Sequence, residues 1–143
     1  MLRRIWFWRF WSLGMFVPLA IIGYWEFIDV GPAARVEWSR LITPQPVRAG
    51  DQIAVLRRVC ILRPGAAGVV NRQFVDGIVF NTPVQAVELP AEAGCHERAF
   101  PFDIPESLPP GRYRYESVGR YRINPITVST VNLGAVEIEV VRP

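Results

Sequence analysis

Lysine is absent from this chain of 143 residues, and all sixteen of its basic side chains are arginine. We attribute this bias to a GC-rich coding sequence rather than to a requirement for guanidinium chemistry. The formal charge is only +3, and Arg3, Arg4 and Arg9 alone account for it, so the rest of the chain is electrically balanced. The sequence therefore predicts no nucleic-acid partner.

Residues that carry chemistry are also scarce. His96 is the one histidine, and it follows one of only two cysteines. A single histidine with scattered carboxylates lacks the ligand count of a zinc site, and the chain has no glycine-rich phosphate loop, Cys-x-x-Cys pair or Gly-x-Ser-x-Gly elbow. Glu137 and Glu139 share one strand face, where we interpret them as solvated. We expect no enzyme, no catalytic residue, no cofactor and no metal, although a polar cleft around His96 would revive the enzyme hypothesis.

A hydrophobic run occupies the start of the chain. Residues 10–25 carry no charged side chain, and the apolar character extends back to residue 5. Because about twenty apolar residues cross a bilayer as a helix, we expect contact with a lipid bilayer through residues 5–25. Aromatic and arginine side chains flank both ends, as membrane-interface anchors do. These anchors are Arg3, Arg4, Trp6, Trp8, Arg9, Trp11, Tyr24 and Trp25.

The flanking charges predict the orientation. Basic residues precede the run and acidic residues follow it, which favours a cytoplasmic N-terminus. The sequence predicts a single-pass inner (cytoplasmic) membrane protein, with a stub and signal-anchor helix over residues 1–31 and a periplasmic or extracellular domain over residues 32–143. A cleaved signal peptide is the alternative, although Pro32 makes residues 31–34 a poor cleavage site. A buried soluble helix does not fit a segment that is apolar on every face.

Beyond residue 32 the chain has short alternating stretches separated by proline and glycine, which indicate an all-β, antiparallel sandwich. Asp76-Gly77 predicts a two-residue hairpin turn. The alternation of apolar and polar residues from 135 to 141 predicts a half-buried last strand. The expected strands are residues 35–42, 52–62, 69–75, 78–80, 84–89, 99–103, 112–117, 121–124, 127–131 and 135–141.

Residues 102–116 (FDIPESLPPGRYRYE) form the most specific stretch, in which a loop ends at Gly111 and a strand begins. This pattern resembles the immunoglobulin-like sandwich, one strand of which opens with Gly-x-Tyr. The resemblance implies that Tyr113 is a structural corner tyrosine whose hydroxyl bonds back to the preceding loop. Tyr115 stands where antibody domains have a cysteine, so the chain does not resemble a true antibody domain.

The two cysteines, Cys60 and Cys95, both follow the hydrophobic run. If that part of the chain lies outside the cytoplasm, a disulfide between them is expected. It would close a loop of about 35 residues and stabilise the fold by roughly 3 to 4 kcal/mol in the chain-entropy model. Two separate buried thiols are the alternative.

Gly-Arg-Tyr-Arg occurs twice, eight residues apart, at residues 111–114 and 119–122. One interpretation is a binding face, because guanidinium groups on one face could bind carboxylate or phosphate. The other is a hairpin with polar residues outward and tyrosines inward. The arginines in question are Arg112, Arg114, Arg120 and Arg122.

These observations favour a non-catalytic protein whose immunoglobulin-like domain is a protein-binding or assembly module in the bacterial envelope. Its partner would be another envelope protein, contacted through exposed strand edges or the proline-rich loop of residues 101–110. The alternative is a phage-encoded membrane regulator of lysis or superinfection that acts through its helix. Gly14 and Gly23 are nine residues apart, which is not a small-xxx-small helix-packing pattern. The oligomeric state is unknown from the sequence.

Overall fold

The structure is a computed structural model that describes the backbone of residues 2–142 and the side chains of residues 14–142. One helix, α1 (Leu2–Phe27), precedes nine strands. The strands are β1 (Ala34–Leu41), β2 (Val47–Arg48), β3 (Gln52–Ile61), β4 (Ala67–Asp76), β5 (Ile78–Asn81), β6 (Gln85–Glu88), β7 (Gly94–Asp103), β8 (Gly111–Arg122) and β9 (Val128–Val141).

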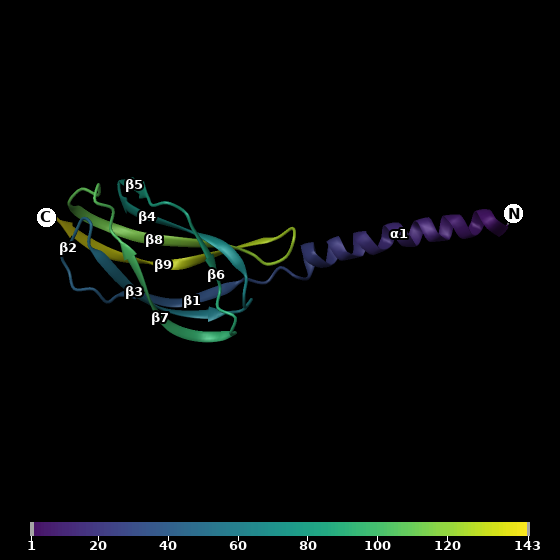
Figure 1. The fold of residues 1–143 in the computed structure, drawn as a ribbon, viewed down its shortest axis with the longest axis horizontal. Coiled ribbons are helices and arrows are strands. Elements are labelled where there is room, and N and C mark those ends of the chain that lie inside the picture. The colour runs from purple at the N-terminus through teal and green to yellow at the C-terminus, as the bar shows by residue number, and fades with distance from the viewer. Residues whose placement is uncertain (1, 143) are drawn as a thin grey trace.

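The strands form two facing sheets, with the helix projecting from one end (Figure 1). The smaller sheet has the order β1-β3-β7, and the larger has the order β2-β9-β8-β4-β5, with β6 also paired to β4. Every pairing is antiparallel except that of the short β2 with β9. The β-sandwich expected from the sequence is confirmed.

The expected strands agree with the structure except at four places. The strands predicted at 112–117 and 121–124 are one strand, β8, and those predicted at 127–131 and 135–141 are one strand, β9. A register shift between Glu116 and Val118, opposite Gly134 at a φ of +90°, absorbs the irregularity without ending either strand. β2 was not predicted, and β7 begins five residues earlier than expected, at Gly94.

The apolar core has two parts that lie one after the other along the sandwich. Val55 and Tyr115 belong to the first part, while Val59 and Tyr121 belong to the second, nearer to the helix. Between them, the inward positions of β3 and β8 are polar: Arg57 is 4% exposed and Ser117 is 1% exposed. A buried charged layer thus interrupts the hydrophobic interior.

A disulfide joins the two strands β3 and β7 of the smaller sheet. Cys60 and Cys95 are directly paired in the register, and their sulfurs are bonded. The predicted disulfide is confirmed, and the alternative of two separate thiols is wrong.

The helix corrects the expected membrane anchor. Among the described residues, no helix is both long and apolar enough to cross a membrane, so the predicted transmembrane span and single-pass location are not supported. Of the predicted interface anchors, Arg3, Arg4, Trp6, Trp8, Arg9 and Trp11 lie outside the residues with described side chains.

The end of the helix is tied to the sandwich by one side chain of the β8–β9 loop and one of the β3–β4 loop. The amide of Asn124 donates to the carbonyl oxygens of Trp25 and Asp29 at 3.2 and 3.0 Å. Arg63 forms an ion pair of 2.5 Å with Asp29. The Asn124 bonds satisfy carbonyl groups at the end of the helix, and both contacts hold the helix end against the sandwich.

Candidate functional site

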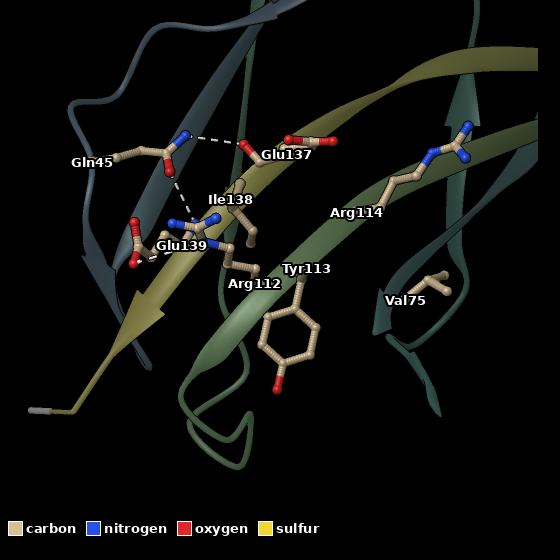
Figure 2. Close-up of a pocket in the computed structure, with 8 residues that line it drawn as sticks. All are labelled: Gln45, Val75, Arg112, Tyr113, Arg114, Glu137, Ile138 and Glu139. Carbon is tan, nitrogen blue, oxygen red and sulfur yellow. Dashed lines mark hydrogen bonds and ion pairs between the residues drawn. The ribbon is translucent and has the colours of Figure 1, made fainter. Parts of the chain in front are cut away.

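A groove of about 410 Å³ lies over β8 and β9 (Figure 2). It is at the end of the sandwich away from the helix, where β8 begins and β9 ends (Figure 1). Figure 2 shows charged side chains of both strands along it, with the side chain of Gln45 beside β9. The residues that line it are Gln45, Val75, Arg112, Tyr113, Arg114, Glu137, Ile138 and Glu139.

The repeated Gly-Arg-Tyr-Arg sequence alternates across β8. Its four arginines are exposed, whereas Tyr113 and Tyr121 are buried. Each buried ring lies against the glycine two residues before it on the same strand face, and the contact is closest at Gly119. The repeat therefore has a packing explanation, because glycine leaves room for the tyrosine ring that follows. The outward arginines and inward tyrosines of the hairpin interpretation are confirmed, but its hairpin is wrong, because both copies lie on the single strand β8. The arginines remain available to solvent.

The arginines in the groove have acidic neighbours, although the ion pairs are exposed. Arg112 Nε lies 4.0 Å from Glu139 Oε1, and the Arg112 side chain is 87% exposed. Arg114 pairs at 3.0 Å with Glu116 on its own strand and forms no described ion pair with Glu137, its register partner. Exposed pairs of this kind contribute about 0 to 1 kcal/mol each. The groove thus offers two positive and two negative groups that a partner could engage.

Gln45 closes the edge of β9 beside the groove. Its Nε2 donates to the carbonyl oxygen of Glu137, and its Oε1 accepts from the amide of Glu139, both at 3.0 Å. The side-chain amide thus occupies the place of a neighbouring strand, just before β2 pairs with the same edge. Sequence analysis missed Gln45, because a glutamine between two prolines carries no periodic signal.

Arg120 and Arg122 stand apart from the groove, at the helix end of β8. They line an open hollow of about 670 Å³ together with Val69, Val128 and Thr130. Within residues 14–142 neither arginine forms an ion pair. The four predicted arginines therefore share one face but form two groups, one among carboxylates and one among exposed valines.

Tyr113 joins β8 to the loop before it. Its hydroxyl donates a hydrogen bond of 2.8 Å to the carbonyl oxygen of Pro109, the contact by which a tyrosine corner is recognised. Burial, with a smaller contribution from nearby Asp76, raises the pKa of Tyr113. The neutral phenol is therefore the form that the fold favours.

The cysteine and histidine region offers no metal ligand set among the described residues. Glu37, Cys60 and Cys95 lie close together, but both sulfurs are consumed by the disulfide and so cannot act as thiolate ligands. His96 lies on β7, and its Nε2 is buried without a hydrogen-bond partner in the described structure.

Arg57 is the residue that sequence analysis missed most clearly. It is on the inward face of β3, in the series Ile53, Val55, Arg57, Val59 and Ile61. The signal was present in the sequence, because the apolar side chains alternate with a period of two and the arginine occupies one of the inward positions. A charged residue in such a place is worth singling out.

Comparison with known proteins shows similarity in fold alone. No family model matches the chain, and no curated protein matches it. Among solved structures, a Niemann-Pick type C2 protein from the Japanese carpenter ant superposes with a TM-score of 0.54 at 10% identity, covering 80% of this chain and 98% of that one. The C-terminal domain of wzt superposes with a TM-score of 0.54 at 11% identity, covering 80% and 77%. The chain is thus similar to these immunoglobulin-like sandwiches in fold.

Proposed function

We propose that the sandwich is a non-catalytic binding or assembly module that recognises an acidic protein surface through the outer face of β8. The supporting observation is the row of four exposed arginines on one strand. Arg120 and Arg122 support it most, because no carboxylate of residues 14–142 pairs with them.

The surroundings of these two arginines have the composition of an interface. Val69 and Val128 are exposed beside them in the same hollow. Arginine is enriched at protein interfaces, where its planar guanidinium binds carboxylates in a bidentate manner. A partner that covers the nearby apolar surface removes it from water, which stabilises the complex. A partner with carboxylates around a small apolar patch would match both features.

An extracytoplasmic location in a bacterial envelope is part of this proposal. The Cys60–Cys95 disulfide supports an oxidising compartment, since cytosolic thiols are usually kept reduced. The alternative of a phage-encoded regulator depends on a transmembrane helix, and no described feature favours it.

The helix is proposed as the element that attaches the module to lipid. Its side chains include Phe16, Leu19, Ile22 and Phe27, all exposed on a helix that projects from the sandwich (Figure 1). Exposed apolar surface of this kind favours association with a lipid surface. Flotation of the full-length protein with phospholipid vesicles tests the attachment, and alkaline carbonate then separates peripheral from integral binding. Protein that stays at the bottom of the gradient would remove lipid attachment from the proposal.

The recognition surface is tested by charge reversal in the full-length protein. The variant Arg120→Glu/Arg122→Glu changes the larger sheet, and the matched control Arg35→Glu/Arg40→Glu makes the same charge change on exposed positions of β1 in the smaller sheet. Partners are identified by crosslinking in the native envelope. We expect the β8 reversal to lose a partner that the β1 reversal retains. Equal retention by both variants would contradict recognition through β8.

A further inference from the structure

Arg57 is a buried cation without an acidic partner among the described residues. Its guanidinium donates one hydrogen bond of 2.7 Å, from Nη2 to the hydroxyl of Ser117. It lies 5.5 Å from the centroid of the Phe100 ring and 6.0 Å from that of the Tyr115 ring. No carboxylate of residues 14–142 forms an ion pair with it. Burial of an uncompensated charge is costly, and aromatic faces and one hydroxyl offset it only in part.

A cavity of about 210 Å³ lies beside Arg57, between the two sheets. It is at the side of the sandwich where β6 borders the larger sheet and β7 borders the smaller, and these two strands do not pair with each other. Most of its wall is apolar. The apolar side chains that line it include Val59, Ile61, Val70, Leu89, Phe100 and Leu133.

Two buried nitrogen atoms in the cavity wall have no hydrogen-bond partner in the described structure: Arg57 Nε and His96 Nε2. Their residues come from neighbouring strands, because Val59 of β3 is in register with His96 of β7 and Arg57 is in register with Arg98. Side chains at such diagonal positions lie within reach of a common ligand. Buried polar groups are nearly always paired in native proteins, so two orphans at one cavity indicate a missing partner.

The charges around the cavity favour an anion. Arg57, Arg72 and Arg98 line it, against one carboxylate, Glu88. Burial lowers the pKa of Arg57, with nearby Arg72 acting in the same direction, while Tyr115 and Tyr121 oppose the shift. An anion at Arg57 Nε would neutralise the buried charge and satisfy the free donor at the same time.

The cavity volume limits the size of the ligand, and the apolar walls indicate the character of the part beyond its anionic group. An engineered cavity of about 150 Å³ holds benzene, so 210 Å³ accommodates roughly eight to ten non-hydrogen atoms. Apolar walls with a few convergent polar groups are typical of sites for small organic molecules. We propose that this cavity binds a small carboxylic acid with an apolar body, as its carboxylate, with Arg57 Nε and His96 Nε2 as donors to the oxygens.

The test uses benzoate and its neutral analogue benzamide, titrated into the full-length protein in nonionic detergent at pH 7.4, with empty micelles as the blank. Methyl NMR signals of Val59 and Leu133, together with the thermal midpoint, report binding. We expect saturable shifts and a raised midpoint with benzoate, and about ten- to a hundredfold weaker binding of benzamide, because the charge-assisted hydrogen bond is lost.

Two variants locate the site. Arg57→Met keeps an apolar side chain of similar length and is expected to fold, since apolar replacements of buried charges are tolerated. It should bind benzoate about ten- to a hundredfold more weakly, whereas Arg35→Met, at an exposed position of β1, should bind as the wild type does. If Arg57→Met does not fold, Leu133→Phe serves instead by filling the cavity. Absence of saturable benzoate binding, equal binding of benzamide, or unchanged binding by the cavity variant would overturn the proposal.

Discussion

Arg57 of β3 and Ser117 of β8 connect the two sheets through the middle of the core, by a hydrogen bond of 2.7 Å from Nη2 to Oγ. Both residues are almost fully buried, and each separates apolar neighbours of the two core regions on its own strand. A polar contact therefore joins the two sheets between the two apolar parts of the core.

Loss of Ser117 should destabilise the fold more than its size suggests. Ser117→Ala leaves the buried guanidinium without its one described hydrogen bond, which should lower the free energy of unfolding by about 1 to 3 kcal/mol. Adding Arg57→Met should restore most of this loss, because the unpaired charge is then gone. Urea unfolding of the single and double variants measures both effects. Ser107→Ala, at an exposed position, is the control, and equal losses at Ser107 and Ser117 would contradict the argument.

Much of the sandwich could be predicted because two-residue periodicity and turn residues are local signals. The hairpin at Asp76-Gly77 and the ends of β1 and β3 are examples, since each depends on residues adjacent in the chain. The two-residue turn expected there is wrong, because Val75 pairs with Val79 and Asp76 with Ile78, so the chain reverses at Gly77. The union of two predicted strands into β8 could not be foreseen in the same way. It depends on pairing with β9 and β4 across long separations, which keeps the strand extended through Val118 and Gly119.

Of the two candidate sites, one could be predicted from local sequence and the other could not. The outward arginines of β8 follow from alternation, so their shared face could be predicted. The cavity depends on which side chains of β3, β6 and β7 come together, and no short sequence pattern encodes that meeting. Arg57 had a local signal, whereas the juxtaposition of its Nε with His96 Nε2 did not.

The disulfide should be a major contributor to stability. The double variant Cys60→Ala/Cys95→Ala removes a link between residues 35 apart, so the free energy of unfolding should fall by about 3 to 4 kcal/mol. Guanidinium unfolding of the variant, beside wild type with and without reductant, measures the effect. Reduced wild type should match the variant. An oxidised protein no more stable than the variant would show that the link contributes nothing.

The two copies of Gly-Arg-Tyr-Arg should differ in tolerance to alanine. A Cβ at Gly119 would lie 2.5 Å from Cε2 of Tyr121, whereas a Cβ at Gly111 would have its nearest neighbour, a carboxylate oxygen of Asp76, at 3.3 Å. Gly119→Ala should therefore lower the free energy of unfolding by about 1 to 3 kcal/mol. Gly111→Ala, the matched control, should change it by less than about 1 kcal/mol. Urea unfolding of the two variants measures these changes. An equal loss of unfolding free energy at both positions would refute the packing explanation.

Stability should fall at alkaline pH because two tyrosines are buried. Burial raises the pKa of both Tyr113 and Tyr121 above the ordinary value of 10.0, so the unfolded chain loses these protons first. Their contribution is complete below pH 10 and is lost as the pH rises through the folded-state pKa, with a slope of about 1.4 kcal/mol per pH unit for each group. Urea unfolding between pH 8 and 11 measures the slope. Tyr113→Phe should reduce it, while Tyr24→Phe, on the exposed helix, should leave it unchanged.

Asn124 should control how firmly the helix is held to the sandwich. Its Nδ2 bonds the carbonyl oxygens of Trp25 and Asp29, and its Oδ1 accepts from the amide of Thr127 at 2.8 Å, so one side chain orders both the loop and the helix end. Asn124→Ala removes these contacts at about 1 kcal/mol each, which should expose the junction more often. Chymotryptic cleavage after Trp25 or Phe27 should then become at least about fivefold faster, because proteolysis follows the open population. Asn132→Ala, which removes a similar local contact in β9, should leave the rate unchanged, and equal rates in all three proteins would mean that the junction is held by the Arg63–Asp29 pair instead.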